Sequence, residues 1–253
     1  MSKPDETSHG VIGRISGAIL ATAVFTSALP AKACEVALAL AVDISGSVDQ
    51  REYQIQMQGL ANGLRDGVIS EALVRAEAAI ALIQWTGSSR QILSVPWTRV
   101  RSFEDVEKLA SVIETVPREW RSFSTAIGDA LNFTAEHFSD VPDCKRLVID
   151  VSGDGESNEG TEPRDVHSNL QRIGITVNAL VIEKADEDLT SYFWENVITG
   201  QGAFVVTANG FNEYPDRMRT KLRREITNQV VRNEQTESET KLYAVRTDEE
   251  TVW

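Results

Sequence analysis

The chain has 253 residues, of which 42% are hydrophobic and 25% are charged, a composition typical of a globular protein with a sizeable core. Asp and Glu total 38 against 25 Lys and Arg, so the formal net charge is −13 at pH 7. Duplex nucleic acid and anionic lipid are therefore poor candidates for the main partner, because binding to them depends largely on basic side chains.

The start of the chain has the features of an export signal. Arg14 precedes an apolar stretch over residues 15–29, and Ala31 and Ala33 fit the small-x-small rule for signal-peptide cleavage. The stretch is short for a membrane span and is interrupted by Ser and Thr. We therefore expect residues 1–33 to be a signal peptide, which places the mature protein in the periplasm or outside the cell. The alternative is an uncleaved leader that anchors the chain in the membrane.

The domain is expected to begin with a buried strand that ends in a polar turn. Residues 36–42 form an unbroken apolar run, typical of a strand buried on both faces of a parallel sheet. After the turn, Ser47 stands three residues before Gln50, the spacing of a capping box at the start of a helix. In open α/β sheets, ligands bind at the turn that follows the carboxyl end of such a strand.

Strands and helices alternate along the rest of the chain, which predicts an α/β fold with a doubly wound, mostly parallel six-stranded sheet and helices on both faces. Pro96 indicates that its strand lies at an edge. The expected strands are residues 36–42, 78–85, 91–100, 145–152, 175–182 and 203–207. The expected helices begin near residues 47 and 125 and also cover residues 103–116, 164–173, 189–197 and 214–231.

The chain divides into three expected regions. Residues 1–33 form the leader, residues 34–232 the folded domain and residues 233–253 a polar, acidic tail. The tail contains one short apolar patch, residues 242–245, so it is either mobile or docked through that patch.

Two cysteines, Cys34 and Cys144, lie in the expected mature chain, each just ahead of an apolar strand. If these strands are parallel neighbours, both thiols lie at the same amino-terminal edge of the sheet, within bridging distance. An oxidising compartment then favours a disulfide between them. The alternative is a lipid-modified Cys34, although Lys32 beside the cleavage point fits that modification poorly.

Three turns that follow expected strands or open expected helices carry oxygen-bearing side chains: the first has Asp43, Ser45 and Ser47, the second Thr125 and the third Asp154. The combination resembles the metal-ion-dependent adhesion site of von Willebrand factor A domains, with an Asp-x-Ser-x-Ser turn, a Thr at the head of a later helix and an Asp after the fourth strand. Within that family the chain is most similar to exported bacterial proteins with this single, Rossmann-like domain. The resemblance covers residues 35–231 and implies the metal ligands Asp43, Ser45, Ser47, Thr125 and Asp154.

Two departures from the family pattern affect the loops but no ligand. The Gly pair that often precedes the Thr is Phe123-Ser124 here, and the frequent Thr-Asp-Gly is Gly153-Asp154-Gly155.

The residue types suit a hard divalent cation. Mg²⁺ prefers oxygen ligands in near-octahedral geometry, and Mn²⁺ or Ca²⁺ is an alternative. Three neutral hydroxyls leave the ion electrophilic, so it accepts one more anionic oxygen. In the family that the chain resembles, a Glu or Asp of a partner protein supplies that oxygen, and the resemblance therefore implies a protein partner with an exposed acidic side chain.

Each of these residues also has a purely structural explanation. Ser47 is a good helix cap, as is either Ser124 or Thr125 at the later helix, and Asp154 begins an ordinary Asp-Gly turn. The metal hypothesis depends on the combination of all three turns.

Asp150 lies inside an expected strand, where a buried carboxylate is costly unless it is paired. One interpretation is a supporting partner of the metal ligands. The other, which we favour, is a hydrogen bond or ion pair with a neighbouring helix.

The leading functional hypothesis is an exported, non-enzymatic binding module that captures an acidic side chain through a bound cation. The alternative is a metal-dependent hydrolase that acts on phosphoesters. The turns contain no evident general base, nucleophile or phosphate-binding Lys, and Arg121 is the nearby cation that the sequence identifies. A third possibility is a scaffold whose metal only rigidifies its loops.

Overall fold

The computed structural model describes residues 34–184 and 188–226. The expected leader, the acidic tail and the end of the last expected helix lie outside these residues. The strands are β1 (Ala37–Asp43), β2 (Ala79–Trp85), β3 (Gln91–Arg99), β4 (Leu147–Gly153), β5 (Ile175–Glu183) and β6 (Val205–Asn209). The α-helices are α1 (Gln50–Arg65), α2 (Gly67–Arg75), α3 (Phe103–Thr115), α4 (Ile127–Glu136), α5 (Pro163–Arg172) and α6 (Leu189–Asn196).

Two short 3₁₀ helices, His137–Asp140 and Phe211–Glu213, complete these elements. Residues 214–226 are also helical, and Ile226 is the last residue that the structure describes. We call residues 214–226 the C-terminal helix. In the part of the chain that is described, no helix is long and apolar enough to cross a membrane.

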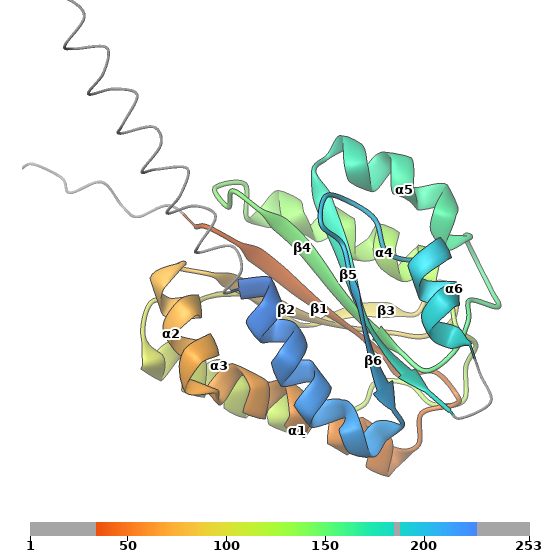
Figure 1. Cartoon of the computed structure of the whole chain (residues 1–253), viewed down its shortest axis with the longest axis horizontal. Coiled ribbons are helices and arrows are strands. Elements are labelled where there is room, and N and C mark those ends of the chain that lie inside the picture. Colours follow the sequence, from red (N-terminus) through yellow and green to blue (C-terminus); the bar gives the residue numbers. More distant parts are fainter. Residues whose placement is uncertain (1–33, 185–187, 227–253) are drawn as a thin grey trace, which may run out of the picture. The chain divides into compact units, whose positions relative to one another are not determined.

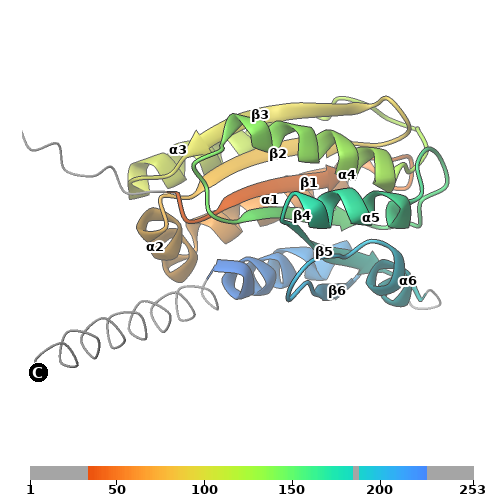
Figure 2. The ribbon, with the colours of Figure 1, turned by 90° about the horizontal axis from the view of Figure 1, so that it is seen from above.

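The six strands form one sheet in the order β3-β2-β1-β4-β5-β6. All neighbouring strands are parallel except β2 and β3, which are antiparallel. The strand with Pro96 is β3, which lies at one end of this order, so its predicted edge position is confirmed. Helices α1 to α3 cover one face and α4 to α6 the other (Figure 1, Figure 2). The predicted fold class, a doubly wound α/β sheet, is confirmed.

In β1, the side chains that point to the two faces of the sheet differ in size. In β1, Leu38 and Leu40 belong to the core beneath α1, α2, α3 and the C-terminal helix. The intervening Ala37, Ala39 and Ala41 belong to the core beneath α4, α5 and α6. Since successive side chains of a strand point to opposite faces, the apolar run is buried on both sides, with room for closer helix packing over the alanines.

Strand order reverses beside β1, the first strand along the chain. From β1 the chain proceeds to β2 and β3 on one side, and then crosses to β4, β5 and β6 on the other. In open α/β sheets, such a reversal leaves a crevice outside the carboxyl ends of the two central strands. The turns after β1 and β4 therefore meet at the place where this fold class binds ligands.

Both predicted helix caps are wrong, in a way that matters for the site. The cap of α1 is Asp49, whose Oδ1 accepts the Glu52 amide at 2.8 Å while Glu52 accepts the Asp49 amide at 2.7 Å. The cap of α4 is Ala126, which offers no side-chain oxygen. Ser47 and Thr125 are therefore not used as helix caps, and capping does not explain their hydroxyls.

Helix α2 was not expected from the sequence. It follows α1 after the single residue Asp66, which accepts the amides of Val68 and Ile69 and so starts a new helix. One polar residue between two helical patterns gives too weak a signal to separate them.

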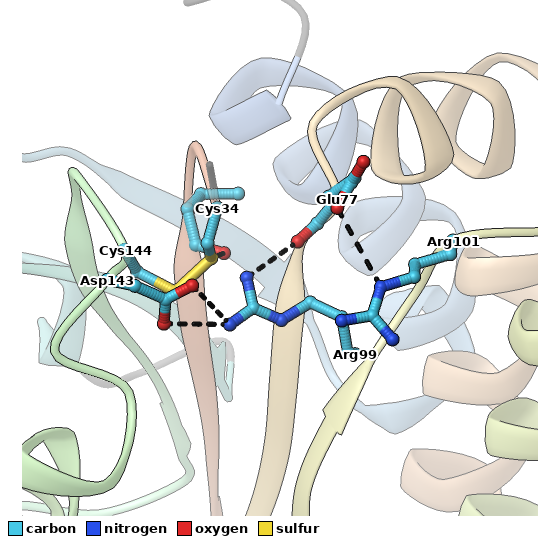
Figure 3. The surroundings of a disulfide bond; sticks show 7 residues. Cys34, Glu77, Arg99, Arg101, Asp143 and Cys144 are labelled. Carbon is cyan, nitrogen blue, oxygen red and sulfur yellow. Dashed lines mark hydrogen bonds and ion pairs between the residues drawn. A yellow bond between two sulfur atoms is a disulfide. The ribbon is translucent and has the colours of Figure 1, made fainter. Parts of the chain in front are cut away.

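The amino-terminal edge of the sheet is cross-linked (Figure 3). Cys34 and Cys144 form a disulfide with their Cα atoms 4.3 Å apart, as predicted from the parallel pairing of β1 with β4. Beside it, Arg99 forms an ion pair with Asp143 at 2.8 Å and donates to the Glu77 carbonyl at 3.3 Å. The disulfide, the ion pair and the hydrogen bond therefore join the segments at this edge on both sides of β1.

Candidate metal centre

Three segments far apart in the sequence line one hollow at the carboxyl edge of the sheet. The hollow has a volume of about 350 Å³ and lies over the ends of β1 and β4 and the loop before α4. Ser47, Thr125 and Asp154, one predicted ligand from each segment, all line it. The structure therefore brings the three turns together; the metal itself stays a prediction.

Asp43, the last residue of β1, is completely buried behind this hollow. Its Oδ1 accepts the Ser45 amide at 2.7 Å, whereas Oδ2 is buried and has no hydrogen-bond donor in the described residues. A Cβ atom at position 153 would lie 3.2 Å from Oδ2, so Gly153 leaves room for the carboxylate. The Gln56 amide donates to the Asp43 carbonyl at 3.1 Å and ties the end of the strand to α1.

A chain of hydrogen bonds connects the first turn to the third. The hydroxyls of Ser45 and Ser47 lie 3.1 Å apart, and Ser47 donates to Asp154 Oδ1 at 2.6 Å. Ser45 is buried, Ser47 is exposed, and Asp154 is 5% exposed. These oxygens therefore lead from the buried Asp43 outward to the hollow.

Two carboxylates near each other in a buried place repel one another. Burial is the main cause that raises the pKa of Asp43, and the negative charge of Asp154 is the next; hydrogen bonds to the carboxylate oppose this rise, and the resulting pKa is about 7. A divalent cation between the two groups would remove the repulsion and give Asp43 Oδ2 a partner. The donor set therefore fits a hard divalent cation.

Hydroxyls have to be part of any such site. The described residues contain no group of three or more His, Cys, Asp or Glu side chains placed to hold a metal ion. Two carboxylates and three hydroxyls match the preference of Mg²⁺ for oxygen ligands, and they leave coordination positions for water or a further anion.

Thr125 is held in the hollow by a backbone clamp that the sequence did not predict. Its amide donates to Asn158 Oδ1 at 3.0 Å, and the Asn158 amide donates to the Thr125 carbonyl at 2.8 Å. Asn158 belongs to the loop that begins with Asp154, so this clamp joins the second and third turns. The polar run after Asp154 was the available signal, but no spacing rule pairs it with Thr125.

Asp150 pairs with the C-terminal helix instead of contacting the metal ligands. Lys221 forms ion pairs with Asp150 and, at 2.7 Å, with Glu225, and all three are buried. Asn178 donates to Glu225 at 2.9 Å. Burial raises the pKa of Asp150, and the charge of Glu225 raises it further. Of the two interpretations from sequence, the structure supports the ion pair with a neighbouring helix.

Arg118 is a site residue that the sequence analysis missed. Its Nη2 donates to the carbonyls of Ile44 and Ser45, both at 2.9 Å, and so supports the first turn from outside. Arg121, the cation that the sequence did identify, lies in the same loop. Two arginines in the loop before Thr125 were a visible signal, but only the fold places the first of them against residues 44–45.

The chain is similar to several solved structures of low sequence identity. Proximal thread matrix protein 1 from the mussel byssus matches with a TM-score of 0.58 and 19% identity over 76% of this chain and 48% of that chain. For a structure of that protein with a zinc-occupied MIDAS motif, the TM-score is 0.57 and the identity 21%, over 76% and 48% of the two chains. A von Willebrand factor type A protein from Catenulispora acidiphila matches with a TM-score of 0.56 and 14% identity over 76% and 43%.

These matches show that the fold is that of a von Willebrand factor A domain, and this chain spans about half of the length of those proteins or less. No curated protein matches the sequence. A family model described as "Protein of unknown function (DUF1194)" matches residues 33–230, most of the chain. The chain therefore belongs to the DUF1194 family.

Proposed function

We propose that this domain is an exported, non-enzymatic binding module that holds a divalent cation, Mg²⁺ first among the candidates, and captures an acidic side chain of a partner protein through it. The ligands are Asp43, Ser45, Ser47, Thr125 and Asp154. The observation that carries the proposal is the buried Oδ2 of Asp43, which has no donor in the described residues and lies behind a hollow lined by hydroxyls and Asp154.

The chemistry of the five side chains supports capture of an anion. The cation would supply a positive charge to which a carboxylate oxygen of the partner binds. Asp43 and Asp154 would balance the two charges of the cation. The hydroxyls would serve as neutral ligands that hold the cation in place without adding charge. Asp43 is fixed by the Ser45 amide and Thr125 by Asn158, so most of the site is arranged before a partner arrives.

The lining of the hollow favours binding over hydrolysis. It consists of Gly, Ser, Phe, Thr, Asp, Glu and Asn residues, and it includes no His, Cys or Lys among the residues described. A nucleophile paired with a base is the usual arrangement in hydrolytic sites, and the lining provides none that is evident.

The proposal of export has separate support. Disulfides persist mainly in oxidising compartments outside the cytosol, and the bond between Cys34 and Cys144 closes the amino-terminal edge of the sheet. With the signal expected at residues 1–33, this places the module in the periplasm or outside the cell.

The metal part of the proposal is tested by titrating the purified protein with Mg²⁺, Mn²⁺ and Ca²⁺ in a calorimeter. We expect the wild type to take up one cation per chain and Asp43→Ala to take up none. Asp165→Ala, which removes an exposed carboxylate on α5, is the matched control and keeps wild-type uptake. Absence of uptake of all three cations by the wild type would overturn the proposal.

The capture part is tested with a labelled hexaglutamate peptide, whose binding is followed by fluorescence anisotropy. Hexaglutamate should bind in Mg²⁺ and lose binding in chelator, while hexaglutamine should bind in neither. Undiminished binding of hexaglutamate in chelator contradicts capture through the metal. Turnover of a generic phosphoester that requires Asp43 would instead establish the hydrolase.

A further inference from the structure

A second hollow adjoins the metal hollow and has the opposite electrostatic character. It has a volume of about 240 Å³, and two arginines of one loop, Arg118 and Arg121, lie in its wall. The full lining is Gly46, Val48, Asp49, Gln50, Arg118, Arg121 and Ser122.

The two arginines form no direct ion pair in the described part of the chain, although the charges of Asp43 and Asp49 act on Arg118. Neither forms a salt bridge there, and the buried Nε of Arg118 has no hydrogen-bond acceptor. Both side chains line the same hollow, so their positive charges lie near each other. The single carboxylate in the wall, Asp49, is engaged in capping α1.

The two hollows are separated by a thin ridge. Gly46 lines both of them, and its amide donates to the Phe123 carbonyl at 2.8 Å, which joins the first turn to the loop of the arginines. A Cβ atom on Gly46 would lie 3.2 Å from that same carbonyl oxygen, so the ridge has no room for a larger residue without movement. Because Gly46 lines both hollows, a single extended peptide, which advances by roughly 3.3 Å per residue, can reach from one hollow into the other.

We propose that the hollow of Arg118 and Arg121 is an anion subsite that takes a second carboxylate of the acidic partner segment whose first carboxylate binds the cation. This inference rests on the proposed function and narrows the partner to a protein segment with at least two nearby Asp or Glu residues. Arginine is suited to this role because its planar fork of donors matches a carboxylate.

The subsite explains how a chain of formal net charge −13 attracts an acidic partner. Exposed charges are screened within about 10 Å at ordinary salt, so the distant acidic surface has little influence at the site. The nearby arginines then provide the attraction. A third arginine, Arg90, lies over the exposed ring of Phe123 at 4.0 Å from its centroid, and Phe123 lines the metal hollow.

The experiment measures labelled hexaglutamate binding to the whole mature chain in excess Mg²⁺. Arg121→Glu is the test variant, because Arg121 is exposed and donates no hydrogen bond described in the structure, whereas Arg118 also supports the first turn. Arg172→Glu, an equal charge change at the end of α5, is the control. We expect Arg121→Glu to weaken binding about tenfold or more and the control to change it less than about twofold.

A peptide with a single Glu among glycines separates the subsite from the metal. We expect this peptide to lose less affinity on Arg121→Glu than hexaglutamate does, because it has no second carboxylate. Equal losses for the two peptides, or equal losses for Arg121→Glu and Arg172→Glu, overturn the subsite. Competition by inorganic phosphate as strong as that by hexaglutamate overturns its assignment to a protein segment.

The outcomes also separate this inference from the proposed function. If chelator abolishes binding and Arg121→Glu has no effect, capture through the metal stands and the subsite is wrong. If chelator has no effect and Arg121→Glu weakens binding, the arginines bind the anion without the metal, and the proposed function fails instead.

Discussion

The two edges of the sheet differ in whether their polar groups are paired. At the amino-terminal edge, Glu35 pairs with Lys145 at 2.7 Å, and Arg99 with Asp143 at 2.8 Å, next to the disulfide. At the carboxyl edge, the buried Asp43 has an oxygen without a donor in the described residues. Paired groups stabilise the fold, whereas a buried group without a partner costs stability unless a ligand supplies one.

This difference indicates that the two ends of β1 and β4 have different roles. One end of β1 and β4 is fixed by a covalent bond and ion pairs, and the other end holds polar groups in place for a ligand. Strain and unpaired groups near a binding site are tolerated because the rest of the domain compensates for them. The following predictions test whether the two edges are independent in this way.

The largest effect is expected from removal of the disulfide. Cys34→Ser together with Cys144→Ser opens a cross-link between residues 110 apart in the sequence. We expect the free energy of unfolding to fall by about 2–5 kcal/mol, because the unfolded chain gains freedom. Urea unfolding measures this loss. Calorimetry of the same folded variant should give unchanged Mg²⁺ affinity, and a changed affinity would show that the two edges are coupled.

An intermediate effect is expected from pH, without divalent cations. The pKa of Asp43 is raised to about 7 in the folded protein, so between pH 3.8 and about 7 the folded state binds its proton more tightly than the unfolded state does. The contribution of Asp43 to stability is therefore present at low pH and is lost as the pH rises through 7. We expect it to fall by about 2 kcal/mol between pH 5 and pH 8.

The control for this pH effect is Asp43→Asn, because Asp150 also has a raised pKa and changes the stability of both proteins in the same direction. The difference between wild type and Asp43→Asn, from thermal unfolding at each pH, isolates Asp43. A difference that does not vary with pH contradicts the burial of a titrating carboxylate. Mg²⁺ should stabilise the wild type more at pH 8 than at pH 5.

The smallest effect is expected from a single ion pair at the amino-terminal edge. Arg99→Ala removes the pair with Asp143, whose side chain is 57% exposed. Because exposed ion pairs contribute little, the free energy of unfolding should fall by about 1 kcal/mol or less. Asp143→Ala should give a similar value in the same assay. A loss as large as that of the disulfide would show that the ion pairs, and not the cross-link, hold this edge.

The alternation of strands and helices was readable from the sequence because both faces of the sheet are covered, which produces long apolar runs such as the one in β1. The same runs placed the turns with Asp43 and Asp154 at one edge. The disulfide prediction followed from that placement. Local hydrophobic pattern and parallel topology were therefore sufficient for the fold and for the edge that Asp43 and Asp154 share, whereas the place of Thr125 beside them was implied by the family resemblance.

Contacts that depend on long-range packing could not be predicted in the same way. Nothing in the local sequence pairs Arg118 with the Ile44 carbonyl, or Lys221 with Asp150 across the sheet. The caps failed for a related reason, since Ser47 and Thr125 have cap-like spacing but their turns face the hollow. For a side chain with two possible roles, the neighbours that the fold places around it determine which role it has, and the spacing in the sequence does not.

The buried ion pairs of the C-terminal helix limit how far the chain can be shortened without a loss of stability. Lys221 supplies the positive charge between Asp150 of β4 and Glu225 of its own helix. A fragment that stops before Lys221 would leave the Asp150 carboxylate uncompensated in the centre of the sheet, a costly arrangement. We therefore expect expression fragments of this domain to be stable only if they include Lys221 and Glu225, even though the candidate metal centre lies at the ends of other elements.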